Sequence, residues 1–179
     1  MKKSLLLLGI FSGLFFSCKD EVELENENEL ITTIELEFVN GTDTKTFQFK
    51  DPDGDGGQAP VINDIALKAN TEYQLSVSFL DESKSPVEDL TEEVAAESDE
   101  HLVVFTPNPS SLGTYTYSDK DVNGFPIGLS GKFKTNQAGT GTLKVQLRHQ
   151  PPINNKSVKN GTVTPGSDDA NVDFKVTVN

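Results

Sequence analysis

Two acidic segments have the residue types and spacing that bind a hard cation. Both read D-x-D-x-[DN]-G, the first half of an EF-hand loop, in which oxygens at alternate positions converge on an ion. The candidate calcium ligands are Asp51, Asp53, Asp55, Asp119, Asp121 and Asn123. The second half of the motif is missing, since position twelve falls on Ile62 or Ser130 and offers no bidentate carboxylate. Calcium is therefore one hypothesis, and ordinary turns, which also favour Asp, Asn and Gly, are the other.

The two histidines form a second candidate site. His149 continues the inward parity of the apolar residues before it, so it is expected where a strand ends and the core opens to solvent. His101 follows an acidic segment and begins another strand. If the two strand ends are neighbours, two imidazoles and a carboxylate would make a transition-metal site of the kind that zinc prefers. No short metal motif such as H-E-x-x-H is present, so hydrogen bonding of each histidine to a neighbouring acid is the structural alternative.

Composition and the absence of motifs argue against several functions. The chain has 15 Lys and Arg against 28 Asp and Glu, with a formal net charge of −13, which would repel a phosphate backbone. No nucleic-acid partner is therefore expected. The sequence also contains no G-x-S-x-G elbow, no P-loop and no G-x-G-x-x-G after a strand. We expect a protein that is not an enzyme.

Alternating apolar residues predict strands along most of the chain from residue 31 onward. The alternation is clear at residues 34–38, 73–79, 143–147 and 172–178. A turn at 40–43 leads into a further strand with Phe47 and Phe49 inward, and weaker candidates are residues 63–68, 101–106, 113–118 and 128–135. Eight or nine short strands without alternating helices predict an all-β fold, an immunoglobulin-like β-sandwich over residues 31–179.

One segment lacks the strand pattern. Residues 89–99 contain Ala95 and Ala96 and show no alternation of β-branched residues. Asp89 or Thr91 is a candidate N-cap, and acidic residues follow in the first turn, where the helix dipole favours them. The segment predicts one short helix that joins two strands.

The start of the chain has the features of a bacterial export signal. Lys2 and Lys3 precede an apolar run that is too short to span a bilayer as a helix. The run ends in Leu14-Phe15-Phe16-Ser17-Cys18, which resembles a lipobox, in which the cysteine thiol takes a diacylglycerol before cleavage. We therefore expect residues 1–17 to be a signal peptide and Cys18 to be the lipidated first residue of the mature protein. Lipidation would also account for a lone cysteine in an oxidising compartment.

Residues 18–30 are expected to be the lipidated cysteine and an acidic tether. Four glutamates alternate between residues 22 and 29, and like charges at this density favour an extended, solvated chain. Lys19-Asp20-Glu21 directly follows the cysteine and resembles the surface-export signal of Bacteroidota-type lipoproteins. The expected location is therefore the outer membrane, with a lipid anchor and exposure at the cell surface.

The chain from about Ile31 to Val178 resembles a family of small Bacteroidota-type lipoproteins of unassigned function, often encoded beside TonB-dependent outer-membrane receptors. The segments that carry the resemblance are Asp51–Gly57, Leu90–Glu93, Asp99–His101, Asn123–Leu129, Gly139–Leu143 and Leu147–Pro151. It implies an accessory role in uptake of a ligand such as a metal or metal-bearing compound, with a TonB-dependent receptor as partner. Some such proteins carry a periplasmic-binding-fold label, which the strand pattern here does not support.

Three functions are consistent with these features. The first is a lipid-anchored cell-surface binding module, accessory to outer-membrane uptake, with calcium in its acidic loops. The second is a transition-metal capture lipoprotein that binds a zinc-type ion through His101 and His149. The third is a structural or adhesive surface protein with no small ligand.

Overall fold

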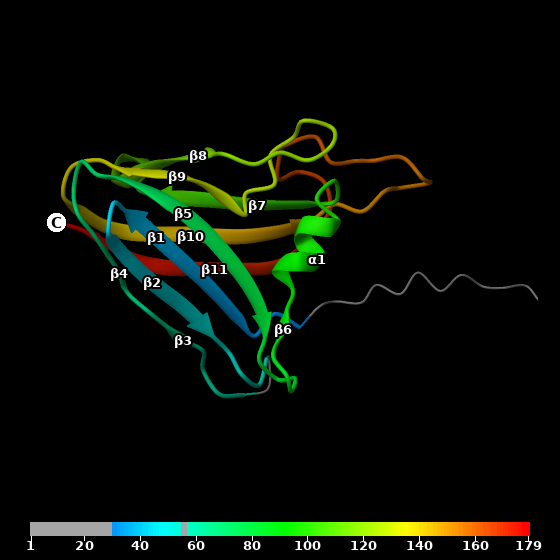
Figure 1. The fold of residues 1–179 in the computed structure, drawn as a ribbon, viewed down its shortest axis with the longest axis horizontal. Coiled ribbons are helices and arrows are strands. Elements are labelled where there is room, and N and C mark those ends of the chain that lie inside the picture. The colour runs from blue at the N-terminus through cyan, green and yellow to red at the C-terminus, as the bar shows by residue number, and fades with distance from the viewer. Residues whose placement is uncertain (1–29, 55–56) are drawn as a thin grey trace, which may run out of the picture.

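A computed structural model describes residues 30–54 and 57–179 (Figure 1). Its strands are β1 (Thr33–Asn40), β2 (Asp43–Lys50), β3 (Val61–Ile62), β4 (Ile65–Leu67), β5 (Glu72–Asp81), β6 (Glu88–Asp89), β7 (His101–Asn108), β8 (Gly113–Tyr117), β9 (Ser130–Thr135), β10 (Gly139–His149) and β11 (Ser167–Val178). The helical segments are α1 (Thr91–Ala96) and the short 3-10 helix η1 (Ser110–Leu112).

The strands form two sheets that pack face to face. The larger sheet has the order β3-β2-β1-β5-β9-β8, with β6 paired to β5, and the smaller has the order β4-β11-β10-β7. All pairs are antiparallel except β4 with β11. The prediction of an all-β sandwich is confirmed. The strand number exceeds the predicted eight or nine because β3 and β6, of two residues each, carry no periodicity that a sequence pattern can reveal.

The strand order is that of the immunoglobulin fold with one addition. An immunoglobulin constant domain has strands A, B, E and D in one sheet and C, F and G in the other. Here β5, β9 and β8 correspond to B, E and D, and β7, β10 and β11 correspond to C, F and G. Strand β4 takes the place of A but pairs with β11, while the β1–β2 hairpin occupies the edge of β5 instead.

Alternation along the strands builds the core. Ile34, Leu36 and Phe38 of β1 are fully buried, whereas the glutamates between them face away from the core. Phe38 packs edge-to-face against the rings of Phe47, Tyr73 and Phe133, with centroids 5.9 Å apart in each pair. These four rings all come from the larger sheet, and aliphatic side chains from β10 and β11 of the smaller sheet belong to the same core.

The predicted helix is present and is shorter than expected. It begins at Thr91 and ends at Ala96, and the chain continues in turns up to residue 100. Asp89 accepts a hydrogen bond from the Thr91 N–H at 3.0 Å, and the Thr91 hydroxyl accepts the Phe79 N–H at 2.9 Å. Val94 is buried against the core, so the helix is fixed to the end of β5. Within the described parts of the chain, no helix is long and apolar enough to cross a bilayer.

Three long connections meet at one end of the sandwich, which we call the loop end. They are residues 82–100, which contain α1, residues 118–129 and residues 150–166. In Figure 1 they lie on the right, with α1 beside the orange 150–166 loop. The chain also enters β1 at this end, because the Thr32 N–H donates to the Leu80 carbonyl at the end of β5.

Candidate metal site at the loop end

The only two histidines of the chain face each other across neighbouring strands. His101 is the first residue of β7 and His149 is the last of β10, and the antiparallel register pairs them directly. Directly opposed side chains on one face of a sheet are in contact. The two imidazole rings stack, with centroids 4.7 Å apart and planes inclined by 12°. The His101 side chain is 3% exposed and that of His149 23% exposed, so the pair opens to solvent on one side.

A backbone hydrogen bond determines where the proton of His101 lies. Its Nδ1 is 3.2 Å from the carbonyl oxygen of Glu97. Because a carbonyl only accepts, Nδ1 carries the proton and Nε2 keeps its lone pair. Burial first, and the neighbouring His149 second, lower the pKa of His101 to about 4, so the ring is neutral at pH 7. A neutral imidazole that donates its other N–H to a backbone carbonyl is the form in which histidine binds metals.

Asp169 is directed at the two rings by a β-bulge. The register between β10 and β11 shifts at Leu147 and Arg148, which leaves Asp169 as an extra residue on β11. Such a bulge re-aims a side chain relative to the simple alternation of a strand. One Asp169 oxygen is 3.7 Å from His101 Nε2, and the other is 3.9 Å from His149 Nδ1. Burial is the main effect on this carboxyl and raises its pKa.

Two glutamates from the connection before β7 complete the cluster. Ligand atoms of Glu97, His101 and His149 all lie within 4.8 Å of one another. Glu100 Oε2 lies 3.7 Å from His149 Nε2. Burial, and next the negative charge of Glu97, raise the pKa of Glu100. The cluster therefore holds three carboxyl groups around two imidazoles, of which His101 is neutral. A bound cation would offset the excess of negative charge.

The separations between Asp169 and the imidazoles suit a shared metal ion better than direct hydrogen bonds. Distances of 3.7 and 3.9 Å exceed the range of N–H···O hydrogen bonds. Zinc binds histidine nitrogen at about 2.0–2.1 Å, so two ligands of a tetrahedral zinc lie roughly 3.3–3.5 Å apart. Closure by roughly 0.2–0.4 Å would bring the Asp169 oxygen to that distance from His101 Nε2. Two imidazoles and one carboxylate are the protein ligands of several open zinc sites.

The second acidic loop binds its own main chain and a lysine. The carboxylate of Asp119 accepts N–H groups within residues 128–130, at 2.8 Å each. Oδ1 of Asp121 accepts two N–H groups within residues 123–125, at 2.9 Å each. Oδ2 of Asp121 is 2.9 Å from the Lys159 Nζ, and both side chains are fully buried. Calcium binding here stays a prediction, and the ion would have to displace the Lys159 ammonium.

The first acidic loop is described only in part. Asp53 accepts the Gln58 N–H at 3.2 Å, and the Asp51 N–H donates to the Thr32 carbonyl at 2.7 Å. Asp55 lies outside the described residues. The calcium prediction for this loop therefore stays a prediction. Residues 1–29, with the expected signal peptide, Cys18 and tether, also lie outside the described residues.

Two residues of the loop end carry no signal in the sequence that singles them out. Asp169 is one of two adjacent aspartates at the start of a strand, and simple alternation from Val172 would direct it away from the core. Lys159 lies between Val158 and Asn160 in a polar loop, where a lysine is normally solvated. Its burial depends on contacts with two other loops that no local pattern encodes.

Comparison of the chain with protein-family models, with curated proteins and with solved structures gave no match. The resemblance to Bacteroidota-type surface lipoproteins therefore stays a prediction. Function has to be argued from the site itself.

Proposed function

We propose that this protein is a non-enzymatic, lipid-anchored binding module of the bacterial outer-membrane surface that captures a zinc-type metal ion. His101 and His149 would supply two nitrogen ligands, and a carboxylate from Asp169 or Glu97 would supply the third. The observation that carries the proposal is the direct pairing of the only two histidines within a group of carboxyl side chains. Capture and delivery of a metal would make the protein accessory to an outer-membrane receptor.

A metal site accounts for the cluster better than a structural histidine pair does. In a structural pair, each imidazole would donate or accept a hydrogen bond with a neighbouring acid. The four nitrogen atoms are instead engaged unevenly: His101 Nδ1 meets a carbonyl, and the other three face carboxylate oxygens at 3.7–3.9 Å. Glu100 and Asp169 are partly buried beside the two rings, and a divalent ion would offset the desolvation of their carboxylates.

The donor set favours a transition metal over calcium. Calcium takes six to eight oxygen ligands, whereas imidazole nitrogen selects zinc, copper and similar ions. The oxygens of Asp119 and Asp121 already accept backbone N–H groups, and the Lys159 ammonium contacts Asp121. These contacts support metal capture ahead of calcium binding as the main role. The partly exposed His149 leaves a side from which an ion can enter and leave.

The location at the surface rests on the lipobox-like residues that end at Cys18 and on the acidic residues that follow it. Eleven residues lie between Cys18 and Leu30, the first residue described, and the twelve residue-to-residue steps across them span at most about 40–43 Å. Because the chain enters the sandwich at the loop end, the histidine pair would lie within reach of a receptor in the same membrane.

Calorimetric titration of the mature chain with zinc tests the proposal. We expect one zinc ion per chain, with binding lost in a His101→Ala/His149→Ala double variant. Asp173→Asn is the matched control, because it removes an exposed carboxylate of β11 that pairs with Lys144 away from the histidines. Zinc affinity that is equal in the wild type and in the folded double variant would contradict the proposal. A wild-type chain that binds neither metal nor receptor would favour the structural or adhesive alternative.

A further inference from the structure

A buried lysine joins the three loops of the loop end. Lys159 lies in the 150–166 connection, and its side chain is fully buried. Lysine is rarely buried without a partner, since its ammonium loses hydration. We propose that Lys159 is the positioning residue of the metal site, a fixed internal cation that the acidic 118–129 loop binds in place of a free ion. This inference rests on the proposed function and identifies what holds its ligands in place.

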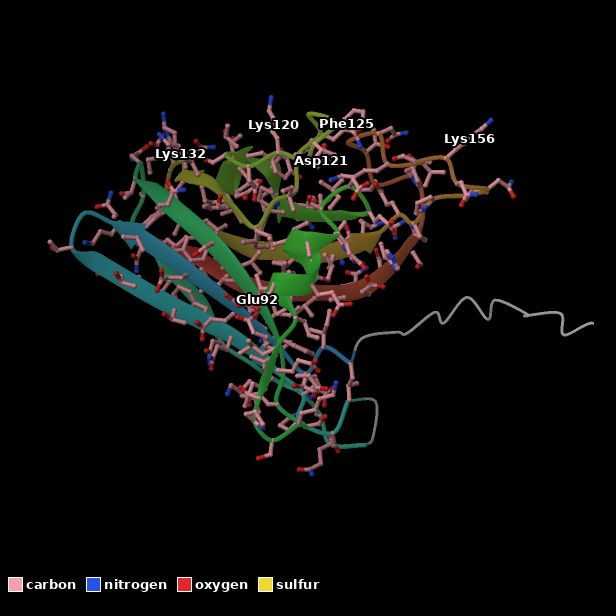
Figure 2. All side chains as sticks on the ribbon, turned by 45° about the vertical axis from the view of Figure 1, so that its right-hand side comes forward. Glu92, Lys120, Asp121, Phe125, Lys132 and Lys156 are labelled. Carbon is pink, nitrogen blue, oxygen red and sulfur yellow. The ribbon has the colours of Figure 1, made fainter. Side chains whose placement is uncertain are left out.

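The contacts of Lys159 reach both neighbouring connections. Its Nζ is 2.9 Å from Asp121 Oδ2 in the 118–129 loop and donates a hydrogen bond of 2.7 Å to the Ser98 carbonyl in the 82–100 connection. Two backbone N–H groups hold the other oxygen of Asp121. In Figure 2 the labelled Asp121 and Phe125 lie together at this end, and Lys156 projects from the tip of the 150–166 loop. One ammonium group thus connects all three loops.

These contacts lie directly beside the candidate ligands. Ser98 directly follows Glu97, whose carbonyl oxygen accepts a hydrogen bond from His101 Nδ1. The hydrogen bond from Lys159 to the Ser98 carbonyl therefore fixes the segment that orients His101. The loop that carries Lys159 begins after His149 and leads back into the strand that carries Asp169. Lys159 therefore restrains the backbone on both sides of the cluster. Groups that orient metal ligands from behind typically change metal affinity by about 10- to 100-fold when removed.

The second acidic motif is explained by the same contacts. A D-x-D-x-N-G segment turns its carboxylates and main chain around a positive charge. In this chain Asp121 is the residue of the motif that contacts a positive charge, the Lys159 ammonium, which the fold supplies from another loop. Asp119 accepts backbone N–H groups. The Asp121 carboxylate compensates the lost hydration of the Lys159 ammonium. Burial alone would raise the pKa of Asp121, but Lys159 and the backbone N–H groups lower it more, so this pKa lies below its usual value.

A charge-neutral double variant separates positioning from electrostatics. Lys159→Met alone would leave the Asp121 carboxylate buried without its cation, which is strongly destabilising. Lys159→Met/Asp121→Asn removes both charges and keeps an amide oxygen that can accept the two backbone N–H groups now bound by Asp121 Oδ1. Removing both partners of a buried ion pair is tolerated better than removing one. The matched control is Lys132→Met/Glu72→Gln, which removes an ion pair of the same 2.9 Å length on the exposed surface.

The test combines zinc titration, the visible spectrum of the cobalt-substituted protein and amide hydrogen exchange of the metal-free protein. We expect Lys159→Met/Asp121→Asn to stay folded, to bind zinc about 10- to 100-fold more weakly, and to show a changed cobalt spectrum, while the control leaves all three unchanged. Exchange at residues 97–101 should rise in the double variant. Unchanged zinc affinity and an unchanged cobalt spectrum in the folded double variant would overturn the inference.

Failure of the metal proposal would be distinguishable from failure of this inference. If the wild type does not bind zinc, the proposed function fails, and faster exchange at residues 97–101 in the double variant would still support Lys159 as the residue that orders these loops. If exchange there is unchanged, Lys159 does not restrain the segment, and the inference fails whatever the wild type binds.

Discussion

Acidification should destabilise the metal-free protein through His101. The pKa of this buried imidazole is lowered to about 4, mainly by burial, whereas an imidazole in the unfolded chain titrates near 6.5. Between these values the unfolded state binds more protons than the folded state, so stability falls as the pH falls. The contribution is fully present above pH ~6.5 and is lost as the pH falls toward ~4. From pH 7.5 to 5.0 the loss is about 2 kcal/mol, or roughly 4–8 °C in Tm for a domain of this size.

Denaturant unfolding at the two pH values, in the presence of a chelator, measures this loss. Glu100 and Asp169 have raised pKa values and act in the opposite direction, because their contribution is lost as the pH rises. The informative quantity is therefore the difference between variants. His101→Gln should reduce the loss between pH 7.5 and 5.0 by about 2 kcal/mol, because it removes the buried imidazole. Equal losses in the wild type and in His101→Gln would refute the reasoning.

Three further substitutions test the packing that supports the site. Gly166→Ala should lower both Tm and zinc affinity, because a Cβ there would lie 1.8 Å from the His149 carbonyl oxygen and φ is +76°; an unchanged Tm would contradict that close approach. Phe38→Ala should lower the free energy of unfolding, measured with denaturant, by about 3–5 kcal/mol, since the ring is fully buried among three others. A loss below ~1 kcal/mol would be inconsistent with that burial. Thr91→Val should cost about 1–3 kcal/mol and speed hydrogen exchange in α1, because it leaves the Phe79 N–H without its acceptor, and protection equal to the wild type would argue against that bond.

The architecture could be predicted because it depends on local periodicity. Ile34, Leu36 and Phe38 alternate with glutamates, and this pattern places one face of β1 in the core whatever its neighbours are. The pairing partners of the strands could not be predicted in this way, because the parallel pairing of β4 with β11 joins residues more than one hundred positions apart. The two-residue strands β3 and β6 are too short for any period, so they could not be predicted.

The sequence predicted the histidine pair only on the condition that the two strand ends are neighbours. Parity directed His149 inward at a strand end, and the register that sets it against His101 is a tertiary property. Asp169 was not predicted, since it reaches the rings through a bulge that reverses the alternation of β11. In the second acidic loop the residue types pointed to a free cation. Calcium binding there stays a prediction. The contact of Lys159 with Asp121 was not predicted, because it joins residues 38 positions apart in sequence and depends on how the loops pack.

The most direct test of the central claim is a crystal structure of the wild-type protein grown with zinc, with anomalous diffraction recorded at the zinc edge. We predict a single strong peak at the nitrogen-bearing edges of the stacked His101 and His149 rings, within about 2.0–2.2 Å of a nitrogen from each and of an oxygen from Asp169 or Glu97. Crystals with zinc bound elsewhere, or with no anomalous peak at the histidine pair, would contradict metal capture at this site.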